Sequence, residues 1–371
     1  MSSSLKVALV HDFLREYGGA ERVLQTLHQM FPQAPVYVAF YDQQALGKHW
    51  QLFCEWDLRQ TWFSRLPFHK KWYSPLRFLA PRAFKDLDLT DYDLVISSSN
   101  AFMAKGVRVP NGTHICYCHT PPRGLYGYST MSNWKKNPLT KLCGQVINHY
   151  MRAVDFKLAQ QVDYFAANSK ETQRRINKFY RRESEVIYPP VKTAQIRDQV
   201  DLSQSRNYFF YVNRLGLQKH PELAVAACTE LEVPLKVAGT GQMLPRLKEM
   251  SGPTIEFLGA VSDKQLFELY AGAKALLYPV EDEDFGMVPI EAMAAGTPVI
   301  AHRSGGPLET IVSDETGLFI NSFRADALAN AVVRSRQIDW DHQAISDYAQ
   351  QFDQSQFKSQ LINLIERVVE L

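Results

Sequence analysis

The chain has 371 residues, too many for one ordinary hydrophobic core and a comfortable length for two domains. Hydrophobic residues make up 46% of the sequence and charged residues 22%, values typical of globular proteins that exclude disordered, fibrous and coiled-coil classes. The longest apolar runs are too short to span a bilayer, and the first residues carry no signal-peptide pattern. Five cysteines, mostly within apolar stretches, favour a reduced cytoplasmic protein.

The net charge of +2 hides two halves of opposite sign. Residues 1–190 contain 25 Lys and Arg against 15 Asp and Glu, whereas residues 191–371 contain 16 against 24. Such an imbalance indicates two domains with different partners, and we expect neither partner to be a nucleic acid.

The segment 59–85 has no carboxylate and seven Lys and Arg, interleaved with bulky aromatic residues. Its prolines predict short amphipathic pieces rather than one helix. We expect this segment to attach to an anionic membrane surface; the alternative is a basic face whose aromatic residues lie in the core.

Short apolar runs alternate with helical patterns along the chain. In the first half, strands are predicted at 6–11, 35–40, 93–98, 113–118, 163–167 and 185–188, with a helix at 20–31. In the second half, strands are predicted near 208–213, 234–239, 254–258, 274–279, 297–301 and 317–320. The helices between them are expected near 220–231, 242–250, 263–273, 288–295 and 307–313, and only helices follow residue 322.

This alternation predicts an α/β fold of two doubly wound, Rossmann-like domains with parallel sheets and a C-terminal helical tail. Pro189 and Pro190 separate the two runs and suit an extended linker. We place the first domain at 1–187, the second at 188–353 and the last helix at 354–371. Sheets of this kind bind ligands beyond the carboxyl ends of their strands, so a cleft between the domains is the expected site.

The stretch 281–296 is the densest in polar and turn-forming residues. Four acidic residues and a glycine form a loop after a strand, and a helix then begins near Pro289 and ends at Gly296. We place Glu291 in the first turn of that helix, where its carboxylate could accept two ribose hydroxyls, while Glu283 lies in the loop and could bind another polyol. The alternative is a solvated acidic loop ahead of a capped helix.

Further candidates follow other strands. Arg214 and Lys219 lie between a strand and a helix and could clamp a diphosphate; the alternative is two solvated loop cations. Gly18 and Gly19 follow the first strand, and Gly239 lies in an equivalent turn, although paired glycines alone are weak evidence.

His119 follows a strand that contains Cys116 and Cys118. The alternation of side chains puts both cysteines on one face and His119 on the other, which disfavours a metal site. We therefore interpret His119 as a hydrogen-bonding residue at a strand end.

Taken together, these segments resemble the retaining nucleotide-sugar glycosyltransferases of family four, group 1, which have the GT-B architecture of two Rossmann-like domains facing a cleft. Glu283 and Glu291 reproduce the family's E-x7-E motif, with Asp284 in place of a usual glycine, and Arg214 and Lys219 match its R-L-x-x-x-K element. The resemblance covers essentially the whole chain.

The resemblance implies a role for each matching residue. Glu291 would bind the ribose, Arg214 and Lys219 the diphosphate, and Gly19 a phosphate oxygen. Glu283 and His119 would bind the transferred sugar. The remaining donor-binding residues would be Gly18, Gly239, Asp284, Phe285, Gly286, Met287 and Val288. Such enzymes need no metal or other cofactor, and their last helix crosses back to the first domain.

These motifs do not identify the nucleotide or the sugar of the donor. The closest likeness is to bacterial polysaccharide-assembly mannosyltransferases, so GDP-mannose is expected, with UDP-hexoses as the alternative. The acceptor would be a glycan or lipid-linked glycan, and the enzyme would be cytoplasmic or peripheral on the inner face of the cell membrane. Three other classes stay open: an inactive nucleotide-sugar-binding subunit, a sugar-nucleotide epimerase, and a dinucleotide oxidoreductase, which would need a G-x-G-x-x-G turn that the first strand lacks.

Overall fold

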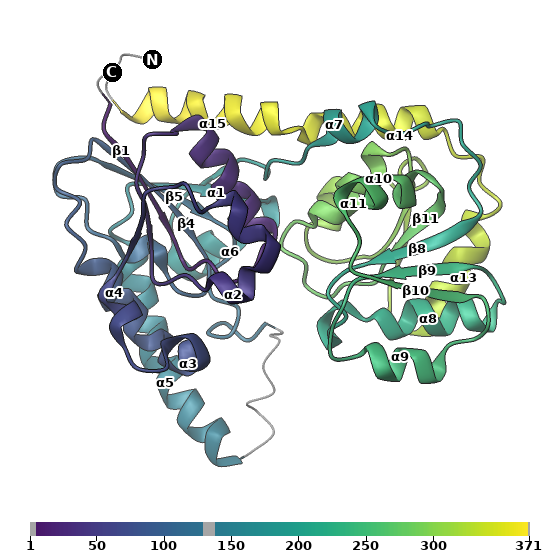
Figure 1. Ribbon diagram of the computed structural model, residues 1–371, viewed down its shortest axis with the longest axis horizontal. Coiled ribbons are helices and arrows are strands. Elements are labelled where there is room, and N and C mark those ends of the chain that lie inside the picture. The colour runs from purple at the N-terminus through teal and green to yellow at the C-terminus, as the bar shows by residue number, and fades with distance from the viewer. Residues whose placement is uncertain (1–4, 129–137, 370–371) are drawn as a thin grey trace. The chain divides into compact units, whose positions relative to one another are not determined.

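The computed structural model describes residues 5–128 and 138–369, which form two compact units (Figure 1). The first unit contains the described residues up to Pro190 and those from Phe357 onward; the second contains residues 191–356. The chain thus passes from one unit to the other at the tandem prolines, three residues after the predicted boundary.

A parallel sheet of seven strands forms the centre of the first unit, in the order β3-β2-β1-β4-β5-β6-β7. Its strands are β1 (Val7–His11), β2 (Val36–Val38), β3 (Leu58–Gln60), β4 (Leu94–Ser99), β5 (Thr113–Cys118), β6 (Tyr164–Ala167) and β7 (Glu185–Val186). The strand order reverses between β1 and β4, as in doubly wound folds, and ligands of such folds bind beyond the carboxyl ends at this point.

Helices cover both faces of this sheet. They are α1 (Gly19–Met30), α2 (Gln43–Leu46), α3 (His69–Leu76), α4 (Ala80–Lys85), α5 (Pro138–Ala159), α6 (Lys170–Tyr180) and the larger part of α15 (Gln354–Val368). Short 3-10 segments are η1 (Gly47–Leu52), η2 (Trp62–Arg65), η3 (Arg77–Leu79) and η4 (Ala104–Gly106). Phe357, Leu361 and Ile365 of α15 pack in the same core cluster as Leu9 of β1 and Leu24 of α1. The last helix is therefore part of the first unit's core.

A six-stranded parallel sheet in the order β10-β9-β8-β11-β12-β13 forms the centre of the second unit. Its strands are β8 (Tyr208–Val212), β9 (Leu235–Ala238), β10 (Ile255–Gly259), β11 (Ala273–Tyr278), β12 (Val299–His302) and β13 (Gly317–Ile320). The helices are α7 (Thr193–Asp198), α8 (Pro221–Glu230), α9 (Leu244–Met250), α10 (Asp263–Ala271), α11 (Met287–Ala294), α12 (Pro307–Thr310), α13 (Ala325–Ser335) and α14 (His342–Ala349), with η6 (Leu217–Lys219) and η7 (Gln350–Phe352). The two sheets confirm the predicted fold class.

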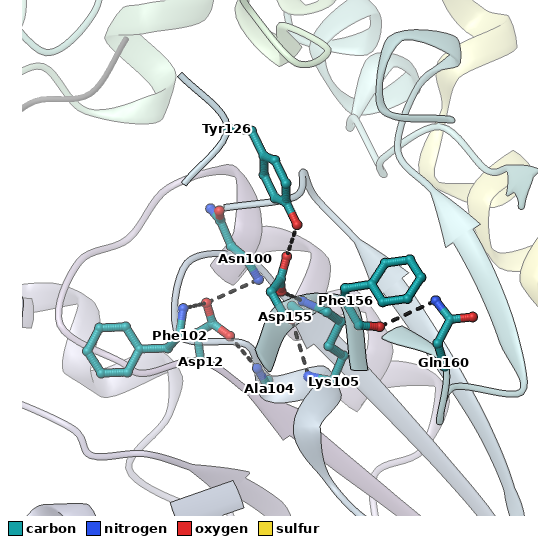
Figure 2. A network of polar contacts seen from close by, with 10 residues as sticks. Asp12, Asn100, Phe102, Ala104, Lys105, Tyr126, Asp155, Phe156 and Gln160 are labelled. Atoms are coloured by element: carbon teal, nitrogen blue, oxygen red, sulfur yellow. Dashed lines mark hydrogen bonds and ion pairs between the residues drawn. The ribbon is translucent and has the colours of Figure 1, made fainter. Parts of the chain in front are cut away.

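A buried polar network fixes the loop that follows β4 (Figure 2). The carboxylate of Asp12, just after β1, accepts hydrogen bonds from the backbone N–H groups of Asn100, Phe102 and Ala104. The next residue, Lys105, forms an ion pair of 2.5 Å with Asp155 of α5, and both side chains are almost fully buried. Asp155 is the first carboxylate after Asp93, at the end of 61 residues without one. A buried ion pair is costly to break, because either partner alone is an uncompensated buried charge.

The sequence analysis missed several elements of the first unit. It did not predict β3, which has only three residues and overlaps the start of the basic segment, nor the helices α2, α5 and α6. The segment 59–85 does form short pieces, as its prolines indicated: η2, α3, η3 and α4. Within residues 5–128 and 138–369, no helix is both long enough and apolar enough to cross a bilayer.

Candidate active site

The strongest candidate site of the second unit lies where β8 and β11 pair, at the point of strand-order reversal. The turn after β8 carries Arg214 and Lys219, and the loop after β11 carries Glu283. Because the two strands are parallel neighbours, both connections leave the same edge of the sheet. The topology thus brings together the two segments that the sequence analysis selected separately.

Lys219 and Glu283 are in direct contact. The Lys219 ammonium lies 2.6 Å from Glu283 Oε2, and the hydroxyl of Tyr278, the last residue of β11, donates to the same oxygen at 2.7 Å. Tyr211 of β8 donates to the backbone carbonyl of Lys219 at 2.8 Å. Burial, and next the Glu283 carboxylate, hold the pKa of Tyr278 well above its usual value, so this phenol remains a donor. The sequence analysis missed both tyrosines.

The loop 281–286 is held by the turn that follows β12. The backbone N–H of Gly306 donates to the carbonyl of Glu283 at 2.9 Å. A Cβ atom on Gly305, which has a φ of 61°, would lie 2.1 Å from that carbonyl oxygen, and one on Gly306 would lie 2.1 Å from the carbonyl of Phe285. Only glycines allow this approach, so the turn sets the position of the Glu283 backbone.

The loop leads into α11 through Gly286, whose φ is 88°. Phe285 and Gly286 are buried, and Asp284, Met287 and Val288 are half-buried. The backbone N–H groups at this helix start have no partners within the helix itself, as in other anion-binding helix starts.

The predicted position of Glu291 within its helix is wrong. Because α11 begins at Met287, before the predicted start near residue 288, Glu291 is its fifth residue and lies in the second turn. The side chain is buried, and the hydroxyl of Tyr270 from α10 donates to Glu291 Oε2 at 3.0 Å. The carboxylate is therefore held in one position by a neighbouring helix.

The packing of the second unit requires a glycine at position 239. Its φ is 117°, and a Cβ atom there would lie 1.9 Å from the carbonyl oxygen of Asn213. Its N–H donates to the carbonyl of Gly259 at 2.7 Å. The backbone of the turn after β9 thus packs directly against the backbone of Asn213, the residue before Arg214. The side chain of Arg214 is exposed.

The three candidates of the first unit lie after β1 and β5. Gly18 has an extended conformation with a φ of −137°, and α1 begins at Gly19. His119 directly follows β5; its backbone N–H donates to Ser99, and its Nε2 lies 2.8 Å from Ser98 Oγ. Burial, and then the nearby His11, lower the pKa of His119 to about 3, so its imidazole is neutral at physiological pH.

Cys116 and Cys118 are buried beside His119, and no three His, Cys, Asp or Glu side chains within the described ranges are grouped as metal ligands. The sequence analysis missed His11, Ser98 and Glu21, which surround His119 and Gly18. His11 and Ser98 lie at the ends of β1 and β4, and Glu21 lies in the first turn of α1. These positions were the only features of the sequence that could have indicated a functional role.

Two family models match adjacent parts of this chain. The model for "Glycosyl transferases group 1" matches residues 192–352, and the model for "Glycosyltransferase Family 4" matches residues 17–195. This protein belongs to the group 1 glycosyltransferases of family 4. The two parallel, Rossmann-like sheets agree with the GT-B fold of this family.

Named relatives include mannosyltransferases. The alpha-1,3/1,6-mannosyltransferase ALG2 of Candida glabrata is 22% identical over 91% of this chain and 86% of its own length. The GDP-mannose-dependent alpha-mannosyltransferase of Corynebacterium glutamicum is 29% identical over 38% of this chain and 33% of its own length. Among solved structures, the Anabaena protein HepE in complex with UDP has a TM-score of 0.68 and 18% identity over 98% of this chain and 100% of its own.

The contact of Gly239 with Asn213 generates a prediction about stability. Gly239→Ala should lower the free energy of unfolding of the second unit by ~1–3 kcal/mol or more, because alanine disfavours this φ and its Cβ meets a backbone oxygen. Gly216→Ala is a matched control in the same region, since a Cβ there meets nothing within 4 Å. Calorimetry on both variants measures the difference. Equal stability of the two would contradict this explanation of Gly239.

Proposed function

We propose that this glycosyltransferase is a retaining hexosyltransferase that transfers mannose from GDP-mannose to a glycan or lipid-linked glycan. The observation that carries the proposal is the contact of Lys219 with Glu283 at the reversal point of the second sheet. There a cation suited to a diphosphate lies beside a carboxylate suited to sugar hydroxyls. The names of the Candida and Corynebacterium relatives support mannose as the sugar.

A UDP-hexose is the second candidate donor. The solved structure of HepE with bound UDP supports this alternative, although its identity to this chain is low. Both donors share the ribose and the diphosphate, so the residues assigned to those groups are the same in either case.

We assign the donor's parts to residues as follows. Glu291, held by Tyr270, binds the ribose hydroxyls; Arg214 and Lys219 bind the diphosphate. Glu283 and the backbone around it bind hydroxyls of the sugar. The other proposed donor contacts are Gly18, Gly19, His119, Gly239, Asp284, Phe285, Gly286, Met287 and Val288. Because an ammonium has three protons to donate, Lys219 can bind a phosphate oxygen while keeping its contact with Glu283.

Catalysis is proposed to depend on stabilising the leaving diphosphate. The bond between the sugar's anomeric carbon and the phosphate oxygen breaks, and the acceptor oxygen bonds to that carbon on the same face. The acceptor's proton passes to the leaving phosphate. Arg214 and Lys219 supply fixed positive charge where negative charge develops, so the reaction is proposed to need no metal ion and no cofactor.

The two glutamates have separable roles in this proposal. Glu291→Gln should weaken GDP binding about tenfold or more, because a charged hydrogen bond contributes ~1.5–3 kcal/mol. Glu283→Gln should change GDP affinity by less than about threefold and lower GDP-mannose hydrolysis by at least tenfold, because its partner is the sugar. Titration calorimetry and a hydrolysis assay make the comparison.

Glu268→Gln, an exposed change on the same helix as Tyr270, is the matched control. Equal losses of GDP affinity in the Glu283 and Glu291 variants would remove the distinction between them.

We further propose that the enzyme works in the cytoplasm at the inner face of a membrane, through its first unit. Of the aromatic residues in the segment 59–85, Phe63 and Phe84 are fully buried, whereas Phe68, Trp72 and Phe78 are 76%, 54% and 45% exposed. Only some of the aromatic side chains in this segment therefore belong to the hydrophobic core, and the others are exposed to solvent.

A second group of exposed apolar residues lies on α5, the helix that Arg77 of η3 contacts. Arg77 of η3 donates to Asn148 of α5 at 3.3 Å, and Figure 1 shows α3 next to α5. Around Asn148, the α5 side chains Val146, Ile147 and Tyr150 are 65%, 48% and 67% exposed. We call these six apolar residues, which belong to α3 and its flanking positions and to α5, the α3–α5 surface.

The elements that carry the α3–α5 surface, together with η2, also carry cations. Lys71, Arg65 and Arg152 are exposed, whereas Arg77 is partly buried and holds the two elements together. Exposed apolar residues together with cations fit an anionic bilayer, in which the apolar groups enter the headgroup region and each cation near the surface contributes ~1 kcal/mol. A lipid-linked acceptor would then stay within reach of the enzyme.

The membrane proposal predicts that the protein sediments with phosphatidylglycerol vesicles, less with phosphatidylcholine vesicles, and is released by salt. Replacing Trp72, Ile147 and Tyr150 with serine should abolish sedimentation and leave donor hydrolysis unchanged. Leu308→Ser with Val333→Ser is the matched control, because it removes exposed apolar residues from the second unit. A wild-type protein that ignores anionic vesicles at low salt would overturn this part of the proposal.

A further inference from the structure

An unbroken series of polar contacts connects the turn before α1 with His119. The Gly18 N–H donates to Glu21 Oε2 at 2.8 Å, and the other oxygen of Glu21 lies 3.6 Å from His11 Nε2. His11 Nδ1 is 3.0 Å from Ser98 Oγ, which is 2.8 Å from His119 Nε2. All four side chains are buried. They lie at the carboxyl ends of β1, β4 and β5 and at the start of α1, and we call them the His119 relay.

Donor and acceptor rules fix the protons along the His119 relay. The His11 nitrogen that faces Glu21 lies 3.6 Å from the carboxylate oxygen, which is an electrostatic contact and not a hydrogen bond. In a neutral His11, a ring proton on that nitrogen gives this contact its favourable sign, because a carboxylate offers no proton of its own. The other nitrogen of a neutral imidazole is an acceptor, so it takes the single proton of Ser98. The Ser98 oxygen must then accept from His119 Nε2–H.

We propose that Glu21, acting through His11 and Ser98, is a positioning residue that holds His119 in its Nε2–H tautomer. His119 Nδ1 then has a lone pair, with which it accepts a hydrogen bond from a hydroxyl of the substrate. The identity of that hydroxyl rests on the proposed function, but the tautomer does not. Among the described residues, none is hydrogen-bonded to this nitrogen, and the backbone of His119 is fixed by Ser99 and Thr172.

Glu21→Gln should invert the His119 relay while keeping its shape. The single amide oxygen stays with the Gly18 N–H, so the amide NH2 faces His11 Nε2 and makes that nitrogen an acceptor. His11 then donates from Nδ1 to Ser98, and Ser98 donates to His119 Nε2. The proton of His119 moves to Nδ1, which can no longer accept from a substrate hydroxyl.

The tautomer is measured by NMR on the full chain labelled with 15N-histidine, using long-range 1H–15N correlations at neutral pH without donor. His119→Gln identifies the His119 signals by their loss. The wild type should show a protonated Nε2 and an unprotonated Nδ1, and Glu21→Gln should show the reverse. Glu55→Gln, an exposed change in the same unit, should match the wild type. Donor hydrolysis should fall about tenfold in Glu21→Gln, as one hydrogen bond is lost, with GDP affinity unchanged.

A wild type that already carries the proton on Nδ1, or a Glu21→Gln variant with the wild-type tautomer, would overturn the inference. If Glu21→Gln does not fold, Ser98→Ala cuts the His119 relay at its centre and should give a mixture of both tautomers; a single wild-type tautomer there would overturn it as well. These results do not depend on transfer. A protein that binds no nucleotide sugar would refute the proposed function and leave the tautomer result standing.

Discussion

The geometry of the second unit's site depends on the ion pair of Lys219 with Glu283. The two residues are far apart in the chain, and they meet because β8 and β11 are parallel neighbours at the reversal point of the sheet. Tyr278 shares the same carboxylate oxygen, and Gly306 fixes the backbone of Glu283. A carboxylate oxygen that contacts both a cation and a phenol has its position set before any ligand binds.

The first unit follows the same plan with different chemistry. Its reversal point, between β1 and β4, brings together Asp12, His11 and Ser98. Asp12 accepts three backbone N–H groups and so shapes the loop after β4, while Lys105 and Asp155 join that loop to α5. His119 therefore sits on rigid neighbours, which suits a residue whose role requires one fixed orientation.

Much of this could be predicted from the sequence, for physical reasons. The buried parallel strands are apolar runs bounded by turns, and Pro189 and Pro190 mark the boundary between the two domains. The fold class and most strands could therefore be predicted. The motif residues Arg214, Lys219, Glu283 and Glu291 were found because they follow strands with strong patterns. Their assignment to parts of a donor stays a prediction.

What the sequence could not reveal depends on contacts between distant segments. The partners Tyr278, Tyr270 and Glu21 are ordinary residues of strands or helices, and only the fold places them beside the site. The helix α11 begins at Met287, directly after Gly286 in its left-handed conformation and before the predicted start, so Glu291 lies in the second turn instead of the first. The elements between residues 58 and 85 are too short for their periodicity to be read.

The central claim is that the cation and carboxylate at the reversal point of the second sheet bind and activate a nucleotide sugar. The most direct measurement is the release of nucleoside diphosphate from GDP-mannose and from a panel of UDP-hexoses, by the wild type and by Lys219→Ala, without an acceptor. The account predicts slow hydrolysis, fastest with GDP-mannose, that Lys219→Ala lowers at least a hundredfold, the scale of one lost preorganised contact (~3 kcal/mol). Equal rates in the two proteins would contradict it, whereas hydrolysis of UDP-hexoses with none of GDP-mannose would leave the site in place and replace the proposed donor.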